Sequence, residues 1–246
     1  MPREAELQIL ARIADTIGHS HHALPSDKVT GFMAMVGQSY QRELMVIGRA
    51  VNGWSTGYTP ESLTSEVTIQ EFVQDVLSSV TKEASCPMRW VSTAWGSTKS
   101  YNTRRSAFWR AVRRVVGALN IADIEDPAWP SCLIWSNLYK IAPCAGGNPS
   151  AMLRSFQLKG CVSLLEEEFQ TYRPRRLLFL SGIGWAEKFL KSLAPSMTVM
   201  PDARYVQAVS KTPESSHAAS TIVVAVHPQG HAESIWVEQV VEAFRS

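Results

Sequence analysis

The sequence predicts an α/β protein with three layers, in which helices cover both faces of a central, mostly parallel sheet of four strands. Four short apolar runs each end in a turn that contains Gly or Pro, as buried parallel strands do where they enter loops. These runs are residues 44–54, 133–141, 177–181 and 221–227. Apolar residues at helical spacing occupy much of the chain before and between the runs.

The N-terminal part is expected to be helical. Apolar residues from Leu7 to Ile17 fall on one face, which predicts a helix over about residues 3–17. Residues 29–42 are predicted to form a second helix that leads into the first strand. Residues 1–42 would then be a helical extension ahead of the sheet.

Further helices are expected along the rest of the chain. Apolar residues from Ile69 to Val80 repeat at helical spacing. Ser106 opens another helix, and Pro149 marks the first turn of one that runs towards Tyr172. Two more helices are predicted from Trp185 and over residues 233–244, and residues 205–210 are predicted to be a short extra strand.

Composition restricts the class of protein only broadly. The chain has 246 residues, 45% of them hydrophobic, which supports a real core in one large or two small domains. The formal net charge is +2, so bulk charge does not require a polyanionic partner. Positive charge does gather at Arg104, Arg105, Arg110, Arg113 and Arg114. Two interpretations stay open, a solvated helix face and contacts with phosphates.

Cysteine usage and hydropathy predict a cytoplasmic protein. The four cysteines are Cys86, Cys132, Cys144 and Cys161. They are scattered and form no CxxC pair, so we expect reduced thiols and not a disulfide framework. No apolar run is long enough to span a membrane, and no signal-peptide segment opens the chain. His19, His21 and His22 have no ligand-spaced Cys or carboxylate partner, so no metal site is expected there.

Polar residues at the strand ends are the candidate functional residues. Loops at the carboxyl ends of the strands form the ligand crevice of an open α/β sheet. The residues that end the four runs are Arg49, Asn52, Asn137, Lys140, Ser181, His227, Gln229 and His231.

Four motifs, in this order, resemble those of the uracil-DNA glycosylase superfamily. They are Gly48-Arg49-Ala50-Val51-Asn52-Gly53, Arg105-Ser106-Ala107-Phe108-Trp109-Arg110, Ser136-Asn137-Leu138-Tyr139-Lys140-Ile141-Ala142-Pro143 and His227-Pro228-Gln229-Gly230. The second is similar to a helix start in mismatch-specific thymine/uracil glycosylases, and the third to a stretch of iron–sulfur-type uracil glycosylases. The resemblance implies one domain over residues 1–246 of uracil-DNA glycosylase-like fold, with an N-terminal extension at about 1–42 and an insertion at about 55–100.

The resemblance also implies a function and roles. The protein would be a DNA glycosylase of base excision repair, a hydrolase that flips uracil or a related damaged base out of DNA. Asn137 would read the base, His227 would donate to the leaving group, and Asn52 would hold the water. The other substrate-binding residues would be Gly48, Arg49, Tyr101 (stacked on the flipped base), Gln229 and His231. The DNA backbone would be contacted by Lys140, Arg104, Arg105, Arg110 and Arg113.

The sequence departs from the family pattern where water is activated. Active relatives place a carboxylate or Asn shortly after the first glycine, and here Arg49 and Ala50 follow Gly48. The alternative is therefore a catalytically silent protein of the same fold that binds nucleic acid or a nucleobase. A small-molecule hydrolase that uses His227 is a third hypothesis. An iron–sulfur cluster on the four cysteines is not expected because the relatives' first cysteine pair is absent, and we expect a monomer without cofactor that binds DNA and no membrane.

Overall fold

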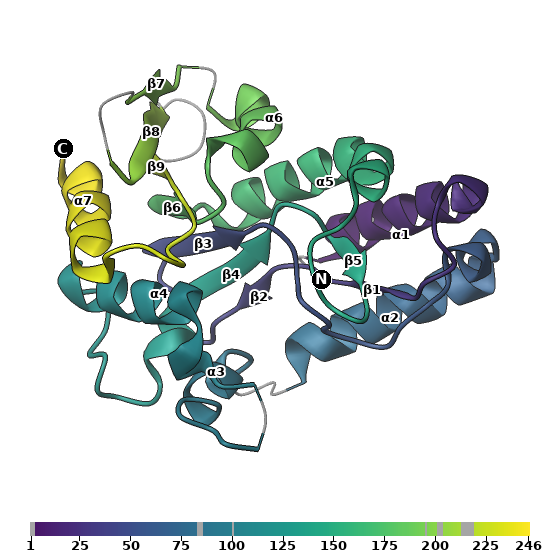
Figure 1. The fold of residues 1–246 in the computed structure, drawn as a ribbon, viewed down its shortest axis with the longest axis horizontal. Coiled ribbons are helices and arrows are strands. Elements are labelled where there is room, and N and C mark those ends of the chain that lie inside the picture. Colours follow the sequence, from purple (N-terminus) through teal and green to yellow (C-terminus); the bar gives the residue numbers. More distant parts are fainter. Residues whose placement is uncertain (1–2, 83–85, 100, 195, 201–203, 213–218) are drawn as a thin grey trace. The chain divides into compact units, whose positions relative to one another are not determined.

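The computed structural model describes residues 3–82, 86–99, 101–194, 196–200, 204–212 and 219–246 (Figure 1). The chain forms two compact units, each built from three segments. Unit 1 comprises Met1–Ala34, Gly48–Lys82 and Ser136–Tyr172, and unit 2 comprises Met35–Ile47, Glu83–Trp135 and Arg173–Ser246. The expected extension at 1–42 and the expected insertion at 55–100 are therefore each divided between the two units.

Unit 1 contains long helices and a small antiparallel sheet. The helices are α1 (Glu4–His19), α2 (Glu66–Thr81) and α5 (Ala151–Tyr172), with the short 3₁₀ helices η1 (His21–Ala23) and η2 (Pro60–Thr64). The sheet pairs β1 (Val29–Gly31) with β5 (Ile141–Pro143). The predicted helices near residues 3–17, 69–80 and 149–172 are confirmed. None of the helices that the structure describes is long and apolar enough to cross a membrane.

A glycine lets α1 and α5 approach closely. A side-chain carbon added at Gly160 of α5 would lie 2.4 Å from Cγ1 of Ile13, which is buried on α1. The predicted apolar stripe of α1 therefore packs on α5 through a contact that only glycine permits.

Unit 2 is organised around the larger sheet, whose strand order is β2-β4-β3-β6-β9-β8-β7. The strands are β2 (Met35–Val36), β3 (Leu44–Gly48), β4 (Leu133–Asn137), β6 (Arg176–Phe179), β7 (Thr198–Val199), β8 (Val206–Thr212) and β9 (Ser220–Ala225). Strands β3, β6 and β9 are parallel neighbours and almost wholly buried, so the predicted parallel core is confirmed. The predicted extra strand at 205–210 is β8.

The central sheet is larger and more mixed than predicted. Within the described residues it has seven strands, not four, because β2 adds to one edge and β8 and β7 add to the other, all in antiparallel pairs. The strands β2 and β7 have two residues each, which is too short for any alternating pattern to be recognised in the sequence.

The helices of unit 2 are short. They are α3 (Arg89–Thr93), α4 (Ala107–Ala118), α6 (Ile183–Leu193) and α7 (Glu233–Arg245), with the 3₁₀ helices η3 (Thr103–Arg105) and η4 (Trp129–Cys132). Ser106 caps α4, since its side chain accepts from the backbone N–H of Trp109. Trp109 stacks edge-on against Trp90 and Trp135, so these tryptophans form part of the core of unit 2.

The predicted helix at residues 29–42 is wrong. This segment supplies β1 to the small sheet of unit 1 and β2 to the edge of the large sheet of unit 2. Phe32, Met33 and Ala34, between the two strands, are also fully buried. A short segment that is apolar throughout shows no periodicity that separates strand from helix, so tertiary pairing decided its form.

The predicted strand at residues 133–141 is two strands in different sheets. β4 ends at Asn137, and β5 begins at Ile141. Between them, the N–H groups of Leu138 and Tyr139 donate to the carbonyl oxygens of Gly48 and Arg49. The chain therefore leaves the large sheet at Asn137, the residue predicted to recognise the base.

Candidate functional site

Asn137 is a buried amide whose nitrogen has no partner among the described residues. It is the last residue of β4, and it is only 1% exposed. Its Nδ2 forms no hydrogen bond with any part of the chain that the structure describes. An unsatisfied buried donor costs about 1–3 kcal/mol, and such groups in native proteins call for an explanation, commonly a missing ligand or water. The predicted base reader therefore has an unused donor.

The first and third motifs come together in unit 1. The backbone bonds from Leu138 to Gly48 (2.9 Å) and from Tyr139 to Arg49 (3.0 Å) tie the loops that follow β3 and β4. Gly48 is buried and has no side chain, so it contributes only its backbone. Arg49 is half-buried, and burial lowers the pKa of its guanidinium. The first and third of the four motifs are thus joined by backbone hydrogen bonds.

Asn52 has a structural partner. Its Oδ1 accepts from the backbone N–H of Gly147 at 2.6 Å, and Gly146 next to it adopts a φ of 97°. A side-chain carbon at Gly146 would come within 2.5 Å of the same Oδ1. The loop 49–57 is therefore attached to the loop after β5 through Asn52, the residue predicted to hold the water.

Lys140 is not a phosphate contact, and that prediction is wrong. Its side chain is fully buried, and its ammonium donates to both carboxylate oxygens of Glu168 at 2.7 and 2.8 Å and to Ser136 Oγ at 2.8 Å. A buried charge requires a close counter-charge and hydrogen bonds, and Lys140 has both. It belongs to the core of unit 1.

His227 is oriented by its own turn in unit 2. It follows β9, and the backbone N–H of Gln229 donates to its Nδ1 at 3.2 Å. An imidazole that accepts at Nδ1 carries its proton on Nε2 when it is neutral. The turn thus sets the ring to donate from Nε2, which is what the stabilisation of a leaving group needs.

Gln229 and His231 lie on the exposed part of the same turn. The His231 ring lies 5.1 Å from the ring of Tyr205, at a tilt of 48°. The guanidinium of Arg204 lies over the ring of Tyr205, 5.1 Å from its centre. His231, which stands where relatives carry an apolar wedge, is therefore supported by a buried tyrosine.

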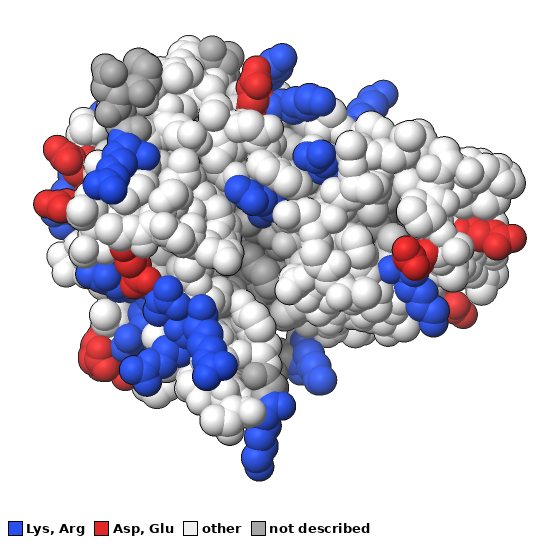
Figure 2. Space-filling view, viewed as in Figure 1, with Lys and Arg blue, Asp and Glu red and all other residues white. Residues whose placement is uncertain are grey.

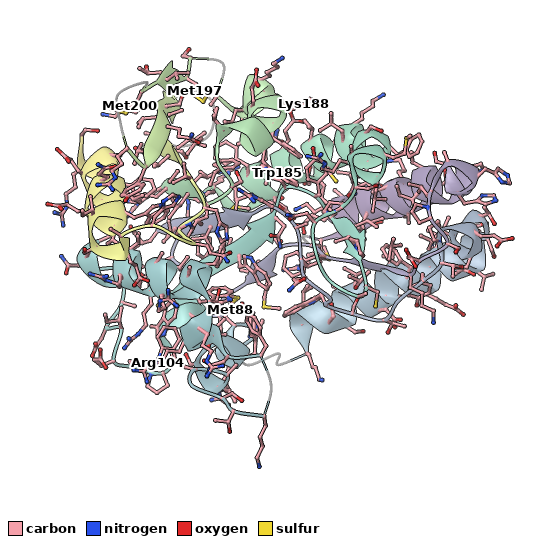
Figure 3. All side chains as sticks on the ribbon, viewed as in Figure 1. Met88, Arg104, Trp185, Lys188, Met197 and Met200 are labelled. Carbon is pink, nitrogen blue, oxygen red and sulfur yellow. The ribbon has the colours of Figure 1, made fainter. Side chains whose placement is uncertain are left out.

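The five arginines near α4 fall into two groups. Arg110 and Arg114 both pair with Glu233 of α7, and Arg113 donates to the backbone oxygen of Ile124 and to Glu125. Arg110 and Arg113 therefore each have a carboxylate partner within unit 2. Arg104 and Arg105 are exposed. Figure 2 shows Lys and Arg gathered where Figure 1 labels α3 and α4, and Figure 3 labels Arg104 there.

Tyr101 stands in a hollow of unit 2. It is 56% exposed, and the hollow of about 430 Å³ is also lined by Ser97, Thr98, Asn102, Arg105 and Ser106. The predicted stacking residue and one predicted phosphate contact therefore share one depression.

The described residues contain no group of three or more His, Cys, Asp or Glu side chains that could hold a metal ion. Cys144 and Cys161 lie in unit 1, and Cys86 and Cys132 in unit 2. Burial raises the pKa of the Cys161 thiol to about 12, so Cys161 is a protonated core residue.

No family model and no curated protein matches this chain. The resemblance to uracil-DNA glycosylases therefore depends on the four motifs alone.

Two buried carboxylates in unit 1, Glu168 and Glu6, were not predicted from the sequence. Glu168 of α5 neutralises Lys140 and also accepts from the N–H of Ala34. Glu6 of α1 is fully buried and accepts from the hydroxyl of Tyr172. Burial, followed by the negative charge of Glu168, raises the pKa of Glu6 to about 7. One signal was available: Lys140 stands in an apolar run, and a buried lysine needs a carboxylate partner.

Proposed function

We propose that the protein is a DNA glycosylase that hydrolyses the N-glycosidic bond of uracil or a related damaged base. The observation that carries the proposal is the buried, unpartnered Nδ2 of Asn137. The carboxamide of Asn offers a donor and an acceptor side by side, which complements the carbonyl and N–H edge of uracil. Binding of the base would satisfy a donor that the protein leaves without a partner.

His227 supports the chemical step. Departure of uracil leaves negative charge on the base, and a preorganised donor that meets this charge stabilises the transition state. The Gln229 N–H fixes the tautomer in which Nε2 is the donor. We assign His227 to the leaving group and keep Arg104 and Arg105 as the backbone contacts, since both are exposed.

The second candidate is a nucleobase- or nucleic-acid-binding protein without catalysis, and Asn52 favours it. The loop 49–57 contains no carboxylate, and the Asn52 oxygen already accepts from Gly147. An amide that is engaged in this way is a poor base for water activation. Recognition by Asn137 would be retained in this candidate, and hydrolysis would be absent.

An abasic-site assay tests the proposal. Oligonucleotides that carry one uracil, hypoxanthine, xanthine or mismatched thymine are incubated with the protein and then cleaved with alkali. We expect scission at uracil or one of the related bases, a loss of roughly 100-fold or more in His227→Ala, and altered base preference in Asn137→Asp. His22→Ala, an exposed histidine of unit 1, is the matched control and should keep full activity.

The same panel separates the two candidates. Absence of scission, together with Asn137-dependent binding of the uracil oligonucleotide, would establish the silent binding protein. Base preference and binding that do not change in Asn137→Asp would remove both candidates, because both depend on this amide.

A further inference from the structure

The loop before α4 in unit 2 is fixed by its own side chains. Oδ1 of Asn102 accepts from the backbone N–H groups of Gly96 and Arg104, both at 3.0 Å, and Nδ2 donates to the carbonyl oxygen of Ser97 at 2.9 Å. Thr103 is fully buried, and its hydroxyl donates to the carbonyl oxygen of Val91 at 2.7 Å. These four bonds hold residues 96–97 and 102–104 in place without any ligand.

Arg110 supports the same loop from α4. Its Nη1 donates to the carbonyl oxygens of Arg104 (3.0 Å) and Arg105 (2.9 Å), while its Nε pairs with Glu233 at 2.8 Å. Arg110 pairs with Glu233, which it shares with Arg114, and supports the backbone of the loop through its Nη1. Arg104 and Arg105 are therefore held through their backbone oxygens, and both residues are exposed.

Exposed side chains of this loop are of the aromatic and cationic types that bind single-stranded nucleic acid in other proteins. Tyr101 is 56% exposed, which is unusual for so large a ring, and Lys99, Arg104 and Arg105 are exposed around it. The hollow that Tyr101 shares with Arg105 measures about 430 Å³, within the range of about 300–1,000 Å³ typical of small-molecule sites. Hydroxyl groups of Ser97 and Thr98 complete its lining.

We propose that this Tyr101–Arg105 hollow binds one nucleotide of a single-stranded nucleic acid. Tyr101 stacks on a base, and the Arg105 guanidinium pairs with the adjoining phosphate. The strand must be unpaired, because the faces of bases in a duplex are already stacked on their neighbours. Arg104, which is labelled in Figure 3, and Lys99 are further exposed cations of this loop that can contact neighbouring phosphates.

This site goes beyond the proposed glycosylase function. It assigns Tyr101 to an ordinary nucleotide of the strand and not to an extruded, damaged base. Its ligand needs no uracil, and its occupation needs no bond to be broken, so the two proposals succeed or fail in different assays.

Fluorescence anisotropy with a labelled oligothymidylate of about 12 nucleotides tests the site. This probe contains no uracil. We expect Tyr101→Ala to weaken binding by about 5- to 100-fold, as removal of one stacked base does, and Tyr101→Phe to keep the wild-type affinity. Arg105→Gln should reduce the slope of log affinity against log salt by about 0.7, the value for one phosphate of a single strand.

Lys188→Gln is the matched control, because Lys188 is an exposed cation of unit 2 on α6 (Figure 3). It should leave affinity within about twofold and the salt slope unchanged. Wild-type affinity in Tyr101→Ala would overturn the proposal and leave a basic patch without base recognition. Tighter binding of a duplex of equal length, or competition by heparin that is as strong against Tyr101→Ala as against wild type, would overturn it as well.

Discussion

Lys140 in unit 1 and Arg105 in unit 2 are cations with opposite environments. The Lys140 side chain has no exposed surface, and its ammonium contacts two carboxylate oxygens and a hydroxyl within 2.8 Å. Arg105 is exposed at the rim of a hollow. The charge of Lys140 is paired inside the protein, and the charge of Arg105 is exposed to solvent.

For these two cations, the residues that flank them in the sequence indicate whether the charge is buried or exposed. Lys140 is preceded by Leu138 and Tyr139 and followed by Ile141 and Ala142, all of them buried. Arg105 stands in a polar run from Asn102 to Ser106. Substitutions at each of the two sites test whether the two cations differ in their contribution to stability.

The largest effect is expected for Lys140→Met. It leaves the Glu168 carboxylate buried without a counter-charge, which should lower the free energy of unfolding by about 3–5 kcal/mol. Adding Glu168→Gln should recover more than half of this loss, since Gln removes the charge and its oxygen still accepts from Ala34. Urea denaturation measures both variants. Arg105→Met is the control, expected within about 0.5 kcal/mol of wild type, and an equally small effect of Lys140→Met would end the distinction.

The pH dependence of unit 1 should follow Glu6. Burial raises its pKa from an ordinary value of 4.5 to about 7 in the folded protein, so the folded state binds more protons between these values. Stability contributed by this group is present below about pH 4.5 and is lost as the pH rises through about 7, on the order of 2–3 kcal/mol. The groups that face Glu6 are Glu168, Tyr172, Arg3 and Lys140.

Glu6→Gln provides the test of that linkage. We expect the variant to match wild type near pH 4.5 and to be more stable near pH 8, because the amide carries no charge to desolvate. Urea midpoints of the two proteins across this range give the difference directly. Parallel stability curves for wild type and Glu6→Gln would show that Glu6 does not titrate in this interval.

Two helix glycines, Gly160 and Gly184, differ in how closely they are packed, and substitutions there should change stability less than Lys140→Met does. Gly160→Ala in α5 should destabilise unit 1 by about 1–3 kcal/mol, because its new carbon would overlap Ile13 of α1. Gly184→Ala in α6 meets no atom within 4 Å, so it should be neutral or stabilising by up to about 1 kcal/mol. Thermal unfolding of the two variants compares them, and equal losses would contradict the close approach of α1 and α5.

The smallest effect is expected for Arg114→Gln. Its pair with Glu233 is half-exposed and shared with Arg110, so the loss should be about 0.2–1 kcal/mol. Chemical denaturation at low and at high salt measures it, and the difference from wild type should shrink as salt rises. A loss of several kcal/mol would place Arg114 in the same class as Lys140.

Periodic helices and the parallel core were predictable, because their patterns are local. The stripe from Leu7 to Ile17, the cap at Ser106 and the buried run of β3 each report their own structure within a few residues. The segment 29–42 and the run 133–141 were not predictable, because their backbone groups find partners about 100 residues away. The site shows the same limit: the strand-end position of Asn137 could be inferred from the sequence, and the absence of a partner for its amide could not.

The sequence by itself determined the periodic helices and the parallel core strands, since apolar spacing fixes which face of an element must leave water. It also placed Asn137 and His227 at or near the ends of strands. Only the tertiary structure decided that Lys140 is a core residue, that Arg110 holds backbone, and that Arg105 faces solvent. The reason is that the cost of a charge depends on the partners and the solvent around it, and these come from residues far away in the chain, such as Glu168 and Glu233.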